Sequence, residues 1–329
     1  MFKAIILRKT EDKTNTLSIE DLNIDDLPKD EILIEVEYST LNYKDSLAVT
    51  NKLPIVKSYP MIPGIDLAGI VRNSSNQNFV IGDKVLLNGS GLGEISWGGM
   101  SQMACVKGNH LIKIPSKFSS MQAMTIGTAG YTAMLAVLAL ERHKITPDKG
   151  EILVTGATGG VGSISVMLLD KLGYQVCAAT GKLENIEYLK TLGAKRIIDR
   201  NELSKECKPL EKEIWAGVID TVGSKILANA CASVKYGGGL VLCGLAQGFD
   251  FPTTVMPFIL RGISLSGIDS VYCPLELRQE AWERLAKDID LGKLQSISSL
   301  ISLSEVLDNA KNMLAGDTKG RIVIDVNMV

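Results

Sequence analysis

A glycine-rich segment near the middle of the chain holds the residues that point most directly to chemistry. Residues 152–154 form an apolar run typical of a strand buried on both faces, and apolar residues recur at helical spacing after the glycines. Between them, residues 157–162 read ATGGVG, with Ala157 in place of the usual first glycine. Gly159 allows backbone to approach a pyrophosphate, Gly162 lets the helix pack on the strand, and the free N–H groups at a helix start attract an anion. This order predicts a dinucleotide-binding turn. The expected pyrophosphate contacts are Thr158, Gly159, Gly160 and Val161.

The end of the next expected strand indicates which dinucleotide binds. NAD sites normally carry an acidic residue about 20 residues further on, which bonds the ribose 2′-hydroxyl. Here the strand ends in Thr180, Gly181 and Lys182, and Arg200 adds a second cation after the third expected strand. Because cations attract a 2′-phosphate and a carboxylate repels it, we expect NADP(H) as cofactor. The alternative is that Lys182 is an ordinary surface lysine.

Composition and charge limit the classes of partner. The chain has 329 residues, enough for two domains, and a formal net charge of -2, which indicates neither nucleic acid nor an anionic membrane as partner. Its six cysteines include no CxxC pair, as expected of reduced thiols in a cytoplasmic protein. The N-terminal apolar run is too short for a signal peptide, and residues 123–140 are better interpreted as a buried helix than as a membrane span.

The pattern of expected elements predicts an α/β fold. Residues 1–124 contain short β-like runs separated by proline and glycine turns, which indicates a small β-rich domain. Strands and helices alternate over 125–269, as in a doubly wound parallel Rossmann sheet. The expected strands of this sheet are 151–155, 175–179, 195–198, 216–219, 239–243 and 263–268. In the last segment, 270–329, we expect two helices and a final strand at 321–326 that returns to the first domain.

Several motifs along the whole chain resemble one known family. They are 39–45 (STLNYKD), 60–66 (PMIPGID), 97–99 (WGG), 126–130 (IGTAG), 220–223 (DTVG) and 252–261 (PTTVMPFILR). Together they resemble the zinc-free, quinone-reductase-like branch of the medium-chain dehydrogenase/reductase superfamily, and within it the NADPH-dependent acrylyl-CoA reductases. The resemblance implies a Rossmann NADP-binding domain, 125–269, inserted in a GroES-like catalytic domain formed by 1–124 and 270–329.

The resemblance also bears on metal binding. Zinc-dependent relatives place a cysteine where this chain has Asn42 and a histidine-glutamate pair where it has Ile65 and Asp66. An amide and an aliphatic side chain cannot replace these ligands. The two histidines, His110 and His143, lie far from any ligand spacing and are expected at the surface or at strand ends. We therefore expect catalysis without a metal.

Without zinc, reduction of a carbon–carbon double bond conjugated to a thioester fits better than alcohol oxidation. The enolate that forms needs hydrogen-bond donors. By resemblance, Asn42 and Tyr43 face the nicotinamide, where the Tyr43 phenol donates a hydrogen bond or the proton, or only packs on the cofactor. Asp45 is expected to orient Lys44 or backbone groups more than to act as an acid. The remaining expected contacts, on the nicotinamide side, are Leu245 and Ser270.

The predicted substrate is a short 2-enoyl-CoA, with acrylyl-CoA reduced to propionyl-CoA. A quinone or general enone reductase would use the same fold and cofactor, so the sequence leaves the acceptor open. A non-enzymatic alternative is an NADPH-binding sensor or RNA-binding protein. Residues 262–268 are expected to form an exposed edge strand, whose pairing with a second copy would give a homodimer.

Overall fold

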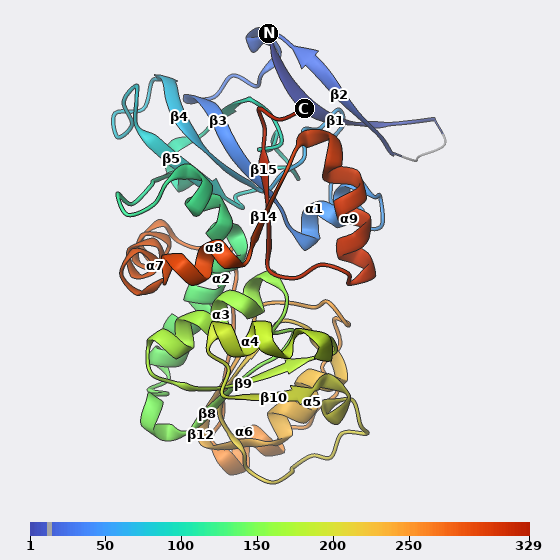
Figure 1. The fold of residues 1–329 in the computed structure, drawn as a ribbon, viewed down its shortest axis with the longest axis vertical. Coiled ribbons are helices and arrows are strands. Elements are labelled where there is room, and N and C mark those ends of the chain that lie inside the picture. Colours follow the sequence, from blue (N-terminus) through green and yellow to red (C-terminus); the bar gives the residue numbers. More distant parts are fainter. Residues whose placement is uncertain (12–14) are drawn as a thin grey trace. The chain divides into compact units, whose positions relative to one another are not determined.

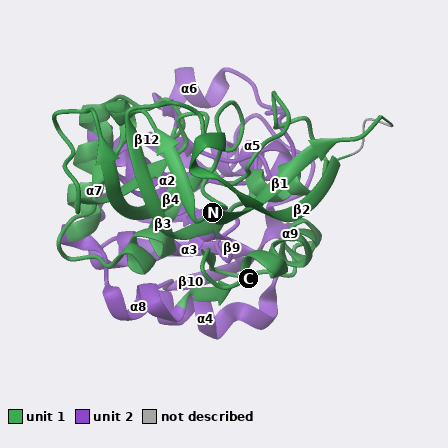
Figure 2. Cartoon of the chain, turned by 90° about the horizontal axis from the view of Figure 1, so that it is seen from above, with its two compact units in different colours: residues 1–128, 270–286, 297–329 green, residues 129–269, 287–296 purple. Residues whose placement is uncertain are grey.

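The computed structural model describes residues 1–11 and 15–329, which form two compact units (Figure 2). Unit 1 comprises Met1–Thr128, Ser270–Ala286 and Ile297–Val329, and unit 2 comprises Ala129–Asp269 and Lys287–Ser296. The last of these segments was expected in the first domain, with the rest of 270–329.

Unit 1 is built on a mostly antiparallel sheet with the strand order β14-β15-β3-β4-β5-β7, in which β14 and β15 pair in parallel, and β6 pairs with β3 outside this path. Its strands are β3 (Ile32–Leu41), β4 (Asp66–Ser74), β5 (Lys84–Asn88), β6 (Met103–Val106), β7 (Ile112–Lys113), β14 (Ser298–Ile301) and β15 (Arg321–Asp325). A separate hairpin pairs β1 (Phe2–Lys9) with β2 (Asn15–Leu22). The final strand β15 pairs antiparallel with β3, so the predicted return of the chain to the first sheet is confirmed. Strands β2 and β14 were not predicted, because β2 is mostly polar and β14 has only two apolar residues.

Helices border this sheet. In unit 1, α1 (Tyr43–Val49) begins directly after β3 and packs against α9 (Val306–Ala315), beside which it lies in Figure 1. Helix α7 spans Leu275–Asp288. Helix α2 (Ser120–Arg142) is kinked at Gly127, which has φ 50° and ψ -161°. Short 3-10 helices occupy Ile24–Asp26, Gly108–His110 and Leu303–Glu305.

Unit 2 holds a six-stranded sheet in the order β10-β9-β8-β11-β12-β13, and every pair in it is parallel. This 3-2-1-4-5-6 arrangement is the Rossmann order, which confirms the predicted fold class. The strands are β8 (Glu151–Val154), β9 (Gln175–Thr180), β10 (Arg196–Asp199), β11 (Trp215–Asp220), β12 (Val234–Leu242) and β13 (Ser264–Gly267). The helices are α3 (Gly160–Lys171), α4 (Ile186–Leu192), α5 (Ser224–Ala232), α6 (Met256–Arg261) and α8 (Leu291–Ser296). Short 3-10 helices are Pro147–Lys149, Leu183–Asn185 and Arg200–Leu203. Strand β12 begins earlier than expected, because the glycines that follow Tyr236 hid its first half.

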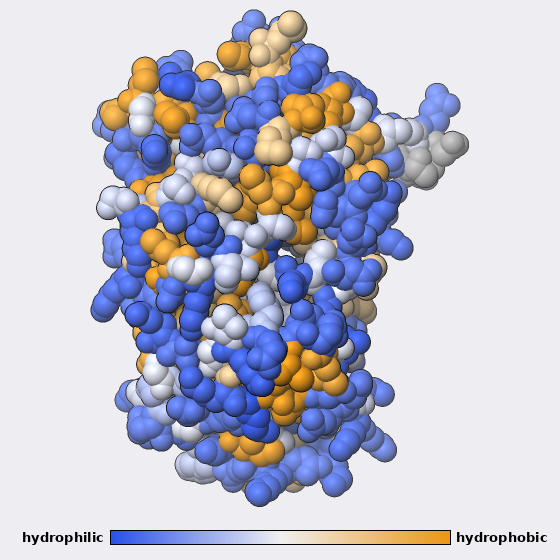
Figure 3. Space-filling model, in the orientation of Figure 1, coloured by the Kyte–Doolittle hydropathy of each residue, from blue (hydrophilic) through white to orange (hydrophobic). Residues whose placement is uncertain are grey.

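Each unit has its own apolar core. In unit 2 the core is centred on parallel strands, with Leu153, Val218 and Leu240 fully buried. On the face shown in Figure 3, hydrophilic side chains surround separate apolar patches. By length and composition alone, α2 is long and apolar enough to cross a membrane, but 94% of its most apolar window is buried. This burial agrees with the predicted core helix.

Candidate active site

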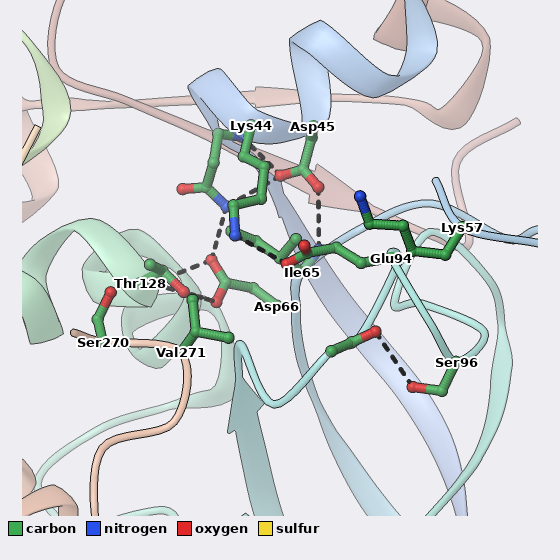
Figure 4. Close-up of polar contacts among 12 residues, drawn as sticks. Lys44, Asp45, Lys57, Ile65, Asp66, Glu94, Ser96, Thr128, Ser270 and Val271 are labelled. Atoms are coloured by element: carbon green, nitrogen blue, oxygen red, sulfur yellow. Dashed lines mark hydrogen bonds and ion pairs between the residues drawn. The ribbon is translucent and has the colours of Figure 1, made fainter. Parts of the chain in front are cut away.

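Asp45 and Asn42 fix the start of α1. Asn42 is the N-cap residue, and Asp45 closes a capping box by accepting hydrogen bonds at Oδ2 from the backbone N–H (2.9 Å) and side-chain amide (3.0 Å) of Asn42. Its Oδ1 accepts from the backbone N–H of Ile65 at 2.9 Å, a contact drawn in Figure 4. Asp45 is fully buried, and this burial raises its pKa to about 7. The carboxyl therefore orients backbone groups, as expected, whereas Lys44 instead pairs with Glu94 at 2.7 Å.

Asp66 is the centre of a second set of buried hydrogen bonds. It lies at the start of β4 with no exposed surface. Its carboxylate accepts from the Asn42 amide (2.9 Å), the Asn88 amide (2.7 Å) and the Thr128 hydroxyl (2.6 Å), as well as from the hydroxyl of Thr40. Figure 4 shows the Asp66 carboxylate directed at Thr128. These donors compensate an ionised carboxylate in a buried position.

Arg321, at the start of β15, brings a cation to the same network. It is buried, and it donates from Nε to the Thr125 carbonyl (3.0 Å) and from Nη1 to Asn42 Oδ1 (3.1 Å). A Cβ at Gly127 would lie 2.5 Å from Nη2 of Arg321 and 2.9 Å from Oδ2 of Asp66, so the guanidinium and the carboxylate face the same point. Burial lowers the pKa of Arg321, whereas the charges of Asp66 and Asp45 raise it. The network thus contains its own positive charge.

Zinc does not fit this arrangement. Its ligands in the zinc-dependent relatives would stand at positions 42, 65 and 66, where the chain has an amide, an aliphatic side chain and a carboxylate. The Asn42 amide oxygen already accepts from Arg321, and the carboxylate of Asp66 is surrounded by donors. Across residues 1–11 and 15–329, no group of three or more His, Cys, Asp or Glu side chains is placed to hold a metal ion.

Tyr43 differs from its neighbours because its side chain points outward. The residue is 41% exposed, whereas Asn42 is buried and its amide bonds to Thr40, Asp45, Asp66 and Arg321. Of the predicted catalytic residues, Tyr43 alone therefore presents an accessible donor in unit 1. Asn42 and Asp45 are engaged in holding the segment from which Tyr43 projects.

In unit 2, the glycine turn has the geometry of an anion cradle. Gly156 has φ +57°, and a Cβ there would lie 2.2 Å from Thr221 Oγ1. Gly156 therefore supplies the tight turn that the first glycine of the motif usually makes. Ala157, which stands at that motif position, is buried. A Cβ on Gly162 would lie 2.3 Å from the Gly156 carbonyl, so α3 packs directly on the turn. The helix begins at Gly160, and its first N–H groups suit a pyrophosphate.

The turn after β9 lies against the Arg200 side chain. The Thr180 hydroxyl accepts from the Lys182 backbone N–H at 3.0 Å, which fixes the turn after β9. A Cβ on Gly181 would lie 2.4 Å from Arg200 Nε, so the Arg200 side chain lies against the Gly181 backbone. The structure thus brings together the strand ends that the sequence predicted to meet. These residues fit a ribose 2′-phosphate, because the Arg200 guanidinium lies against Gly181, which stands between Thr180 and Lys182 in the chain, and β9 ends in no carboxylate.

The residues that support the glycine turn were not predicted from the sequence. Asp220, at the end of β11, is buried and accepts from the Thr155 hydroxyl and the Gly223 backbone N–H, both at 2.7 Å. Its burial raises the pKa of Asp220. The Thr221 hydroxyl donates to the Thr155 carbonyl at 3.0 Å. The ends of β8 and β11 are thereby tied together beside Gly156, and the DTVG motif (220–223) was the available signal.

Two other predicted contacts lie on loops. Leu245 is 58% exposed after β12, in unit 2. Ser270 belongs to unit 1, where its carbonyl accepts from Arg278 at 3.4 Å. His110 is half-buried in a 3-10 helix just before β7, and burial lowers its pKa. His143 lies 2.7 Å from the Ser266 hydroxyl.

Comparisons with known proteins agree with both units. Residues 28–116 match the alcohol dehydrogenase GroES-like domain family, and residues 160–287 match the zinc-binding dehydrogenase family. The chain is 49% identical to the probable acrylyl-CoA reductase AcuI of Escherichia coli (99% of this chain, 100% of the relative). It is 46% identical to the acrylyl-CoA reductase AcuI of Ruegeria pomeroyi (99% and 100%) and 43% identical to the putative quinone oxidoreductase YhfP of Bacillus subtilis (98% and 98%).

Solved structures extend the likeness to the fold. The yhdH oxidoreductase from Salmonella enterica, solved in complex with NADP, has a TM-score of 0.96 at 48% identity (98% of this chain, 99% of that chain). Bacillus subtilis yhfP, solved with NAD bound, has a TM-score of 0.95 at 43% identity (98% and 99%). The chain therefore belongs to the medium-chain dehydrogenase/reductase superfamily, among the relatives of AcuI and YhfP.

Proposed function

We propose that this protein is an NADPH-dependent enoyl-CoA reductase that reduces the carbon–carbon double bond of acrylyl-CoA to give propionyl-CoA. The observation that carries the proposal is identity of 49% and 46% to two acrylyl-CoA reductases along almost the whole chain. A Rossmann unit with a cationic adenosine end supports it.

The cofactor is held by residues of unit 2. The turn that contains Thr158, Gly159, Gly160 and Val161 binds the pyrophosphate, and Thr180, Gly181, Lys182 and Arg200 hold the 2′-phosphate. NADPH, when bound, supplies the hydride that reduces the double bond. The YhfP structure contains NAD, so the Arg200 guanidinium against Gly181, together with Lys182 in the next position, is the local feature that favours NADPH here. Leu245 and Ser270 are proposed contacts on the nicotinamide side.

Residues at the start of α1 have two different roles in the proposed reaction. Tyr43, exposed at the first position of the helix, donates a hydrogen bond to the enolate oxygen or the proton that the α carbon of the enolate takes up to form the product. Asn42 and Asp45 are positioning residues, because their polar atoms are bonded within the buried network. Of the three predicted catalytic residues, Tyr43 is therefore the proposed donor, and Asn42 and Asp45 hold the start of α1.

Steady-state oxidation of NADPH tests the reaction. We expect kcat/KM to be highest with acrylyl-CoA, lower with crotonyl-CoA and much lower with a soluble quinone. Tyr43→Phe keeps the ring and removes the hydroxyl, so we expect it to lower kcat more than KM, while Tyr272→Phe, an exposed tyrosine outside the described network, serves as the control. Appreciable turnover with the quinone alone would overturn the assignment.

The second candidate is a quinone or general enone reductase. It is favoured by the 43% identity to the putative quinone oxidoreductase YhfP over 98% of both chains. The same three-substrate comparison separates the two candidates. Failure to oxidise NADPH with any of these acceptors would leave an NADPH-binding module instead of an enzyme.

We also propose that the protein is a cytoplasmic homodimer. Strand β13 is the edge of its sheet, and exposed apolar side chains lie on it and on α6, with Leu265 at 42% and Ile259 at 73% exposure. Pairing with the β13 strand of a second copy would cover this edge. Light scattering tests the pairing: a mass of twice 35.5 kDa supports it, Leu265→Lys should shift the protein toward monomer, and a wild-type monomer would refute it. The six free cysteines suit a reducing compartment.

A further inference from the structure

A groove in unit 1 begins at Tyr43 and is not used by the network described above. It has a volume of about 780 Å³ and lies between α1, α9 and the start of β2. This volume is within the range of small-molecule sites. Tyr43 and Leu47 line it from α1, and Leu307, Lys311 and Leu314 line it from α9.

The lining of the groove is mostly apolar and carries two lysines. Tyr43 is the first residue of α1, Lys52 lies three residues beyond its last, and Lys311 lies within α9 between Leu307 and Leu314. The seven residues of α1 rise about 10 Å, so the backbone positions of Tyr43 and Lys52 are well separated along the helix. The groove therefore combines apolar walls with a phenol and two ammonium groups.

Two lysines give the groove its charge. Lys52 is exposed, and Lys311 is exposed with its Nζ 3.1 Å from Oδ1 of Asp308 on the same helix. That ion pair is exposed on both sides, so solvent screens it and it contributes little. Both ammonium groups are therefore placed to meet an anionic ligand.

We propose that this groove binds the pantetheine arm of the acyl-CoA substrate and that Lys52 and Lys311 bind its phosphates. The inference rests on the proposed function, which places the thioester near Tyr43. A pantetheine arm has an apolar backbone with two amides and ends in phosphates, so it combines the chemistry that apolar walls and two lysines suit. A quinone carries no phosphate for the two lysines to bind.

Direct binding tests the groove separately from turnover. Butyryl-CoA, which has no double bond to reduce, is titrated calorimetrically into the protein with NADP⁺ bound, and the N-acetylcysteamine thioester of butyrate serves as a ligand without phosphates. The double variant Lys52→Gln/Lys311→Gln is compared with Lys29→Gln, an exposed lysine outside the groove. We expect the double variant to bind butyryl-CoA about tenfold more weakly, as expected for two exposed ion pairs.

The remaining measurements separate charge recognition from a general disturbance. The short thioester should bind wild type and double variant equally, and the salt dependence of butyryl-CoA binding should decrease in the double variant. Ala315→Phe, which fills the groove without changing charge, should also weaken butyryl-CoA. The proposal is overturned by unchanged butyryl-CoA affinity in the double variant, by equal losses for both thioesters, or by an equal loss in Lys29→Gln.

Turnover measurements then separate the proposed CoA groove from the proposed reaction. Reduction of acrylyl-CoA with unchanged butyryl-CoA affinity in the double variant would refute the groove and leave the enzyme assignment intact. Weakened binding in that variant, combined with turnover of quinone only, would support the groove and refute the proposed reaction.

Discussion

Arg200 lies so close to the backbone of Gly181 that a single methyl group at position 181 must displace it. A Cβ there would lie 2.4 Å from Nε, 2.7 Å from Cζ and 2.8 Å from Cδ of Arg200. Gly181 is not among the glycines with φ in the left-handed region, so alanine fits its backbone. Gly181→Ala therefore moves the guanidinium without removing its charge.

The size of the effect follows from the exposure of the site. A hydrogen bond to a charged group contributes about 1.5–3 kcal/mol, and Arg200 is exposed, so we expect about 1–2 kcal/mol after screening. That energy corresponds to about a 5- to 30-fold loss in kcat/KM for NADPH. NADH has no 2′-phosphate, so its kcat/KM should not change.

The assay measures kcat/KM for NADPH and NADH with acrylyl-CoA as acceptor. Arg200→Ala should also lower kcat/KM for NADPH and leave kcat/KM for NADH unchanged. The double variant Gly181→Ala/Arg200→Ala should lose no more kcat/KM for NADPH than Arg200→Ala alone, because both changes remove the same contact. Gly292→Ala is the matched control, since a Cβ there meets only a flexible Asp290 side chain at 3.3 Å. Equal losses for NADPH and NADH, or additive losses in the double variant, would refute the assignment of Arg200 to the 2′-phosphate.

Three further predictions concern the buried network of unit 1. Because burial raises the pKa of Asp45 from 3.8 to about 7, the folded chain keeps a proton that the unfolded chain releases, so stability should fall between about pH 4 and about pH 7 and then level off. Asp45→Asn should remove up to about 4 kcal/mol of this fall in urea unfolding, and an unchanged pH slope would contradict the assigned pKa. Gly127→Ala should cost about 3 kcal/mol and lower Tm, because φ is 50° and the added Cβ meets Arg321 Nη2 at 2.5 Å; a variant as stable as wild type would argue against this geometry. Arg321→Met should destabilise the protein by about 3–5 kcal/mol by leaving Asp66 uncompensated, whereas Arg72→Met at an exposed ion pair should cost less than about 1 kcal/mol; equal costs would show that the buried charge is not needed.

The sequence predicted unit 2 well because its signals are local. A continuous apolar run, a glycine turn and a helical period follow one another within residues 151–171, and the same alternation repeats along the sheet. The parallel order then follows from the fold class. That Arg200 lies close to the turn after β9 was also predictable, because the carboxyl ends of β9 and β10 are adjacent in that order. Gly156 was overlooked, since only its conformation shows that it takes the role expected of the following position.

The site in unit 1 was much less predictable, because its partners are far apart in the sequence. Asn42 and Arg321 are separated by 279 positions, and no spacing rule links an amide after β3 to a cation at the start of β15. The last strand was correctly predicted to return to the first sheet, but the sequence does not give its register. Ile322 pairs with Leu41, and this register places the neighbouring Arg321 beside Asn42.

That register brings a buried cation to the Asp66 carboxylate. The charge of Asp66 raises the pKa of Arg321 against the effect of burial, so the two groups interact favourably. The guanidinium also donates to Asn42 Oδ1 and to the Thr125 carbonyl, and it is therefore engaged within the network. The network holds Asn42 at the start of α1, directly before the exposed Tyr43, whose phenol suits the proposed hydrogen bond to an enolate oxygen.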